Sequence, residues 1–206
     1  VHPIPLPNHL LKSLVWLSSY YLNPVAKTAN LFLPLGIEKN RRKKSTTTTN
    51  TISATTIKTA IPTTITSTAT NTTPTTATSK QIPLNSAQKQ ALAELHKIKT
   101  HTKLLHGITG SGKTNIYLKL AQQIFDSNQS IILLVPEISL TPQLVGRFQE
   151  HFGTQVISLH SKLTEAERHL IWQRIHEADQ STPFVVIGPR SALFSPLKNL
   201  GLIIID

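Results

Sequence analysis

One stretch of eight residues decides the fold of the chain: Gly107-Ile108-Thr109-Gly110-Ser111-Gly112-Lys113-Thr114. It fits the pattern G-x-x-x-x-G-K-[ST] at every fixed position, and average residue usage gives a chance match a probability of roughly one in a hundred. The glycines let successive backbone N–H groups turn inward around phosphate oxygens, and a following helix adds its positive N-terminus. The stretch therefore predicts a phosphate-binding loop between a strand and a helix.

The polar side chains of this loop have distinct predicted roles. Lys113 would reach the β- and γ-phosphates of a bound nucleotide, and the Thr114 hydroxyl would ligate Mg²⁺. The other expected nucleotide contacts come from the loop itself, at Gly107, Thr109, Gly110, Ser111 and Gly112. A merely flexible glycine loop is the alternative interpretation.

Apolar runs of strand length alternate with helical patterns from residue 84 onward. We expect five strands, at 103–106, 131–135, 155–159, 184–187 and 202–206. One helix is expected after the loop, one from Thr141-Pro142 to about 152, and one from Thr164, in a capping box with Glu167, to about 178. This alternation predicts an α/β fold with a parallel sheet and right-handed crossovers.

Asp206 stands at the end of the last apolar run. In P-loop folds an acid at such a strand end holds Mg²⁺ through water, so Asp206 and Lys113 are the predicted catalytic residues. An aspartate that only caps a turn is the alternative. The residue that positions the attacking water is expected beyond the last residue of the sequence.

The first 80 residues are strongly basic. They hold Glu38 as their single acid, against nine lysines and arginines, and the whole chain has a formal net charge of +11. Such a balance suits a polyanion, because each cationic side chain that reaches a phosphate releases a counterion. A solvated charged loop and an anionic membrane surface are the alternatives for the basic run at 41–44.

The N-terminal region has helical spacing over residues 9–22, where Leu10, Leu14, Leu17 and Tyr21 form one stripe. We expect Asn8 as the N-cap and Asn23-Pro24 as the end, followed by a second short element through 31–33. These pieces are too small to bury a core alone, which predicts that they belong to a larger domain. The pair Tyr20-Tyr21 is expected in the core rather than as a base-stacking platform.

Residues 45–79 are about half threonine and hold few large apolar side chains. Burial there cannot offset the entropy of ordering the chain, so we expect a disordered linker. The predicted organisation is a remnant at 1–40, a basic and then threonine-rich linker at 41–80, and an α/β lobe at 81–206.

The sequence contains no cysteine, and its nine histidines lack the spacing of metal ligands. It has no run of 18 apolar residues, so no membrane span and no membrane partner are predicted. It lacks a starting methionine and a secretory signal, and it ends inside an apolar strand, so we expect a piece of a longer protein.

Several segments resemble the family of primosomal protein N′, the bacterial replication-restart helicases of superfamily 2. They are the loop at 107–114, Val135-Pro136-Glu137-Ile138-Ser139-Leu140-Thr141-Pro142-Gln143, Leu159-His160-Ser161, and Ile187-Gly188-Pro189-Arg190-Ser191-Ala192-Leu193-Phe194. Leu197–Asp206 is similar to the run into the D-E-E-H box of that family, and the likeness covers 81–206. Residues 16–24 and 33–34 resemble, more weakly, the end of the family's DNA-binding domain, which binds the 3′ end of a nascent strand.

The resemblance implies the first RecA-like lobe of an ATP-dependent helicase that moves 3′ to 5′ on DNA. It implies ATP and Mg²⁺ at Lys113, Thr114 and Asp206, and zinc only in parts of the family protein that lie outside this sequence. Gln88 would read the adenine edge, although Asn85 and Gln88 are equally suited to form a capping pair for a helix. Arg190, Ser191 and Thr141 would lie along the DNA path, with a structural salt bridge as the alternative for Arg190.

The resemblance also implies partners and a location. These are forked and single-stranded DNA, other primosome proteins and single-strand binding protein, in the cytoplasm near the nucleoid. Departures are Asn115 and Ala87, where acids are usual, Pro189, where threonine is usual, and the threonine tract in place of a winged-helix domain.

A lobe without its partner is expected to bind nucleotide weakly and to hydrolyse almost none. Two rival hypotheses remain. One is a P-loop NTPase of another class, such as a kinase or a transporter ATPase. The other is a non-catalytic DNA-binding relic.

Overall fold

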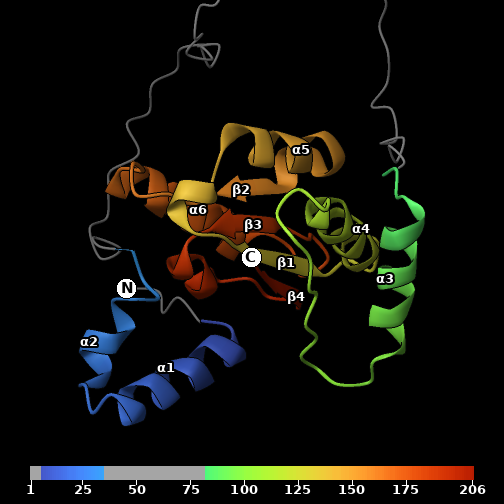
Figure 1. Ribbon diagram of the computed structural model, residues 1–206. Helices are drawn as coiled ribbons and strands as arrows, with labels where there is room; N and C mark the ends of the chain where they lie inside the picture. Colours follow the sequence, from blue (N-terminus) through green and yellow to red (C-terminus); the bar gives the residue numbers. More distant parts are fainter. Residues whose placement is uncertain (1–5, 35–81) are drawn as a thin grey trace, which may run out of the picture. The chain divides into compact units, whose positions relative to one another are not determined.

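The computed structural model describes residues 6–34 and 82–206, and every structural statement below concerns these residues. The predicted disordered linker, the basic run at 41–44 and Glu38 lie outside them. Figure 1 shows a parallel sheet flanked by helices. The α/β fold with a parallel sheet, predicted from the alternation, is therefore confirmed.

The sheet has four strands in the order β2-β3-β1-β4, and all three pairings are parallel. The strands are β1 (Ser130–Leu134), β2 (Val156–Ser158), β3 (Val185–Gly188) and β4 (Leu200–Ile205). β1 lies inside the sheet, with Ile131 opposite Val185 on one side and Leu202 on the other. Its apolar side chains are almost fully buried on both faces, as a continuous apolar run predicts.

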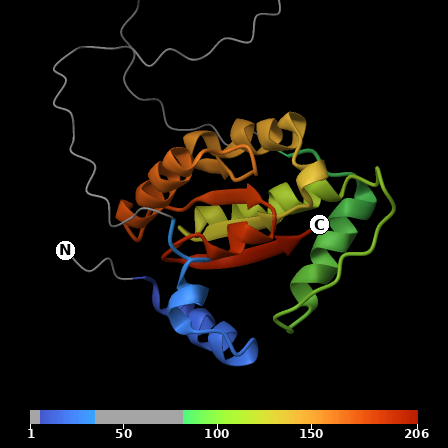
Figure 2. The ribbon, with the colours of Figure 1, turned by 90° about the vertical axis from the view of Figure 1, so that its left-hand side faces the viewer.

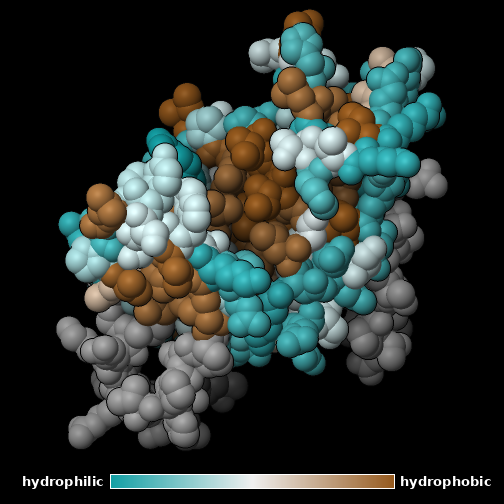
Figure 3. Space-filling model, turned by 90° about the horizontal axis from the view of Figure 1, so that it is seen from below, coloured by the Kyte–Doolittle hydropathy of each residue, from teal (hydrophilic) through white to brown (hydrophobic). Residues whose placement is uncertain are grey.

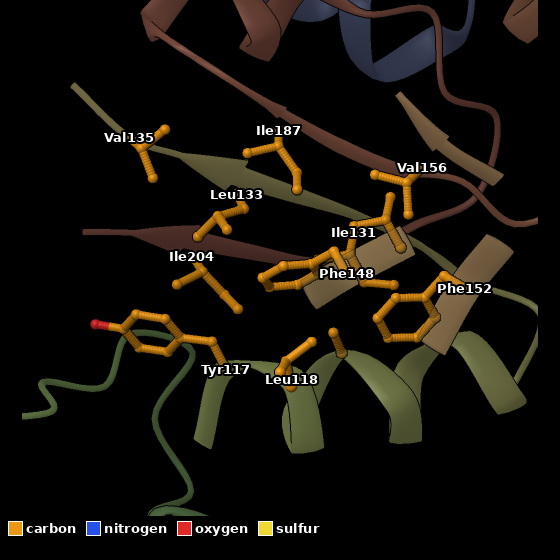
Figure 4. Close-up of a cluster of buried hydrophobic side chains, with 12 residues drawn as sticks. Tyr117, Leu118, Ile131, Leu133, Val135, Phe148, Phe152, Val156, Ile187 and Ile204 are labelled. Atoms are coloured by element: carbon orange, nitrogen blue, oxygen red, sulfur yellow. The ribbon is translucent and has the colours of Figure 1, made fainter. Parts of the chain in front are cut away.

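Two helices cover one face of the sheet. They are α4 (Lys113–Asp126) and α5 (Pro142–Phe152). Their side chains form the larger core cluster with β1, β3 and β4, and Figure 4 shows Phe148 and Phe152 between the helices and the strands. The opposite face packs against α6 (Glu165–Glu177) and the 3₁₀ turn η3 (Arg190–Phe194) through Ile132, Val186 and Ile175.

The helices begin where capping side chains predict. Thr141 accepts from the N–H of Leu144 at the start of α5, and Pro142 follows at the first helical position. Thr164 and Glu167 form the predicted capping box of α6. The same motif, made by Asn85 and Gln88, begins α3 (Ser86–Lys97). Short 3₁₀ turns, η1 (Glu137–Ser139) and η2 (Gly153–Gln155), flank α5, which Figure 2 shows from the side.

The strand expected at 103–106 is not formed. Residues 102–108 have no regular secondary structure, and within the described chain no strand pairs with them. Leu105 is half-buried against the larger core cluster, whereas Leu104 is 87% exposed. The alternation of an exposed Leu104 with a half-buried Leu105 fits an extended chain, but a strand also needs a neighbouring strand for its backbone hydrogen bonds.

The N-terminal helices differ from the prediction in three details. α1 spans Asn8–Tyr20, so Pro7, not Asn8, occupies the N-cap position. The second element is α2 (Val25–Ala29), which precedes 31–33 instead of including it. Tyr20 and Tyr21 are not core residues: they are 65% and 62% exposed. Tyr20 lies off the face that buries Leu10 and Leu14, and Tyr21, although it is on the predicted stripe, follows the last residue of α1.

The α1–α2 segment packs through Phe32. Its ring lies edge-on to Phe194, with 4.7 Å between centroids, and its carbonyl accepts from the Trp172 indole N–H at 3.0 Å. Leu10 and Leu14 complete this third cluster. Figure 3 shows apolar side chains gathered in a hollow on one side of the molecule. Separately, Ile203 and Ile205 of β4 are exposed side chains.

Candidate nucleotide-binding site

The glycine loop ends in a helix whose first turn is open. Gly112 is the N-cap of α4 and has a φ of 81°. Because glycine has no side chain, it cannot provide a side-chain cap. Gly110 has the same φ of 81°, a conformation that favours glycine. The first N–H groups of a helix lack intrahelical partners, which makes this turn suitable for an anion.

Lys113 is folded back over the loop. Its ammonium group donates to the carbonyls of Gly107 at 2.9 Å and Ile108 at 3.3 Å. The positive charge is therefore held above the turn where the sequence predicts phosphate. Exchanging these neutral carbonyls for phosphate oxygens would give shorter, stronger charge-assisted hydrogen bonds.

Gln88 lies behind the loop and is almost completely buried. Its oxygen accepts from the N–H of Asn85, and its amide nitrogen donates to the carbonyls of Ser111 at 3.3 Å and Gly112 at 3.2 Å. The capping pair with Asn85, one of the two roles considered for this glutamine, is confirmed. The adenine contact stays a prediction, and it would use an amide whose oxygen and nitrogen both already have partners.

Asp206 follows β4 directly. Its N–H donates to the carbonyl of Leu134, which extends the pairing of β4 with β1 by one residue. One carboxylate oxygen accepts from the Tyr117 hydroxyl at 2.8 Å. Tyr117 lies three residues after Thr114 on α4, so this bond brings the predicted acid and the loop helix to the same end of the sheet.

Sequence reasoning missed Tyr117 as part of the site. No local pattern in the sequence indicates the contact, because Tyr117 and Asp206 are 89 positions apart. Burial of the ring and the bond to Asp206 raise the pKa of Tyr117 far above its ordinary value. The Tyr117 hydroxyl therefore stays protonated near neutral pH and can donate to Asp206.

The residues present fit a magnesium nucleotide. Thr114 and Asp206 offer a hydroxyl and a carboxylate, the oxygen ligands that Mg²⁺ prefers. A Cβ at Gly107 would lie 2.9 Å from the Ser111 hydroxyl, so the loop is close-packed there.

No group of three or more His, Cys, Asp or Glu side chains suited to a metal occurs in the described residues. None of their helices is long and apolar enough to cross a membrane.

The predicted DNA contacts lie in two loops: Thr141 follows β1, and Arg190 and Ser191 follow β3. The Glu137 carboxylate accepts from the N–H of Ser161 at 2.7 Å, which joins the loops after β1 and β2. The hydrogen bonds to Ser161 hold the pKa of Glu137 below its usual value. The Arg168 guanidinium binds the carbonyls of His160, Ser161 and Leu163.

The three residues predicted to contact DNA differ in whether their side chains already make a contact within the protein. Arg190 and Ser191 are exposed after β3. The Thr141 hydroxyl is engaged as the cap of α5. Among residues 6–34 and 82–206 no acidic partner of Arg190 is found. Its contact with DNA stays a prediction.

A glycine loop at the start of α4, an acid after β4 and a parallel sheet define a RecA-like lobe of the P-loop class. A family model described as "Type III restriction enzyme, res subunit" matches residues 81–206, more than half of the chain. The chain belongs to this helicase family, and the predicted resemblance to the replication-restart helicases is confirmed by its relatives.

Three relatives illustrate the likeness, and each carries the name "Replication restart protein PriA". That of Bacillus subtilis (strain 168) is 42% identical over 132 residues, which cover 62% of this chain and 16% of the relative. That of Chlamydia pneumoniae is 33% identical over 259 residues, 98% of this chain and 34% of the relative. That of Rickettsia felis is 33% identical over 205 residues, 98% of this chain and 27% of the relative. The chain thus spans at most about a third of these proteins, and the last two alignments include its N-terminal segment.

Proposed function

We propose that residues 81–206 form the first, ATP-binding motor lobe of a 3′-to-5′ DNA helicase that acts in replication restart and primosome assembly. Residues 1–40 are then a remnant of its DNA-binding domain, and 41–80 a linker. The observation that carries the proposal is the open first turn of α4 beneath Lys113, beside Asp206. The names of the relatives support the restart role.

The chain's own residues divide the work of binding. Backbone N–H groups of the loop receive the phosphates, and Lys113 turns from the Gly107 and Ile108 carbonyls to phosphate oxygens. Thr114 and Asp206 hold the metal, Asp206 through water. Magnesium bound there would neutralise charge that develops on the phosphates. Gln88 keeps the loop backbone in place from behind.

The carboxyl ends of β1, β2 and β3 supply the proposed DNA path. Arg190 and Ser191 are free to reach a phosphate backbone, and Thr141 contributes through the loop that it caps. The proposed partners are forked and single-stranded DNA, primosome proteins and single-strand binding protein, in the cytoplasm near the nucleoid. This lobe alone binds ATP weakly and hydrolyses almost none, because a motor site closes between two lobes.

The test is ATP hydrolysis with and without forked DNA, by this chain and by one that continues past Asp206 to the end of its reading frame. The proposal predicts DNA-stimulated hydrolysis by the longer chain only. Stimulation by another substrate would favour a P-loop NTPase of another class. DNA binding that nucleotide does not change, without hydrolysis by either chain, would favour the non-catalytic relic.

A further inference from the structure

Tyr117 has two distinct parts. Its ring is 8% exposed and packs in the larger core cluster, and Figure 4 shows it beside Ile204 with the hydroxyl pointing away from the cluster. The hydroxyl reaches the Asp206 carboxylate at 2.8 Å. A residue that served only the core would need no hydroxyl there, since phenylalanine fills the same space.

Asp206 is fixed at two points. Its backbone N–H is bonded to Leu134, and one side-chain oxygen is bonded to Tyr117. The second oxygen is left for a metal-bound water. A carboxylate held in this way loses little rotational freedom when it binds the hydrated metal, so the entropy cost of ordering it lowers the metal affinity less.

Tyr117 also connects the two elements that carry the proposed metal ligands. Thr114 is on the first turn of α4, and three residues along a helix correspond to a rise of about 4.5 Å. Asp206 follows β4 on the neighbouring side. The hydrogen bond between Tyr117 and Asp206 therefore ties the threonine helix to the aspartate strand.

We infer that Tyr117 is a positioning residue for Asp206: its hydroxyl orients the carboxylate and fixes the spacing between the two magnesium ligands. The inference rests on the proposed function, since it deepens the role of the same site. Removal of the hydroxyl should weaken the response to Mg²⁺ and leave the nucleotide's other contacts intact.

The experiment is a titration of a fluorescent ATP analogue against this chain, in EDTA and at increasing Mg²⁺. Tyr117→Phe should need about tenfold more Mg²⁺ to reach half of the metal-dependent increase in affinity for the analogue. Loss of a residue that holds a metal-binding side chain in place typically has an effect of this size. Its affinity in EDTA should equal that of wild type. Tyr20→Phe, which removes a hydroxyl from an exposed ring, should match wild type throughout. Adding Tyr117→Phe to Asp206→Asn should change nothing further.

Equal Mg²⁺ requirements for Tyr117→Phe and wild type would overturn the inference while leaving nucleotide binding intact. Absence of nucleotide binding by wild type would instead contradict the proposed function. The bond between Tyr117 and Asp206 is then tested by a measurement without nucleotide. The chain has three tyrosines, so Tyr20→Phe/Tyr21→Phe, made with ¹³Cζ-labelled tyrosine, leaves Tyr117 as the single labelled signal in NMR. Asp206→Asn must shift this signal; an unmoved signal means that the bond is absent.

Discussion

At the scale of single residues, the loop is constrained by backbone conformation and by packing, and Gly110 and Gly112 differ in which of the two applies. Both have a φ of 81°, where a side chain costs about 1–2 kcal/mol. A Cβ at Gly110 meets nothing within 4 Å, whereas one at Gly112 would collide with the Gln88 amide. Only the second glycine is therefore required by packing as well as by backbone conformation.

We predict that Gly112→Ala lowers the free energy of unfolding more than Gly110→Ala does. Both variants carry the backbone cost, and the difference between them measures the collision with Gln88. Urea denaturation of each variant provides the comparison. When Gln88→Ala is added to each glycine variant, most of the difference in unfolding free energy between them should disappear. Equal losses of unfolding free energy for Gly110→Ala and Gly112→Ala would contradict the packing described here.

A second residue-scale prediction concerns pH. The pKa of Glu137 is lowered in the folded chain by its hydrogen bonds to Ser161, from an ordinary value of 4.5. Stability from this contact is therefore present above about pH 4.5 and is lost as the pH falls through the folded pKa. Urea midpoints of wild type and Glu137→Gln should converge below pH 4.5. A constant offset between Glu137→Gln and wild type across this pH range would refute the prediction.

At the scale of elements, the capping signals predicted helix starts well. Thr141 and Thr164 cap α5 and α6 where expected, because a cap is a contact between residues three apart. The expected strand at 103–106 failed because a strand needs a partner that local sequence does not specify. The Tyr117–Asp206 bond was missed for the same reason: its members are distant in sequence.

The cap of α6 can be tested by itself. Thr164→Ala should cost about 1 kcal/mol of unfolding free energy, since the hydroxyl accepts from the N–H of Glu167. Thr164→Ser keeps the accepting oxygen and should recover most of the loss. Equal losses for alanine and serine, measured by urea denaturation, would mean that the hydroxyl does not stabilise the helix start.

At the scale of the whole molecule, the described N-terminal residues are attached to the lobe through Phe32. We predict that Trp172→Phe costs about 1–3 kcal/mol, because it leaves the buried Phe32 carbonyl without its donor. Trp16→Phe, at a 59% exposed position, should change stability by less than about 0.5 kcal/mol. Equal effects of the two substitutions would show that the N-terminal segment does not dock as described.

The central claim is that the loop at 107–114 binds a magnesium nucleotide. The most direct measurement is calorimetric binding of ATP and Mg²⁺ to this chain and to Lys113→Ala. We predict weak binding by wild type, and a loss of about tenfold or more in the variant, since a hydrogen bond to a charged group contributes about 1.5–3 kcal/mol. Binding that survives Lys113→Ala unchanged, or none by wild type at millimolar nucleotide, would contradict the account.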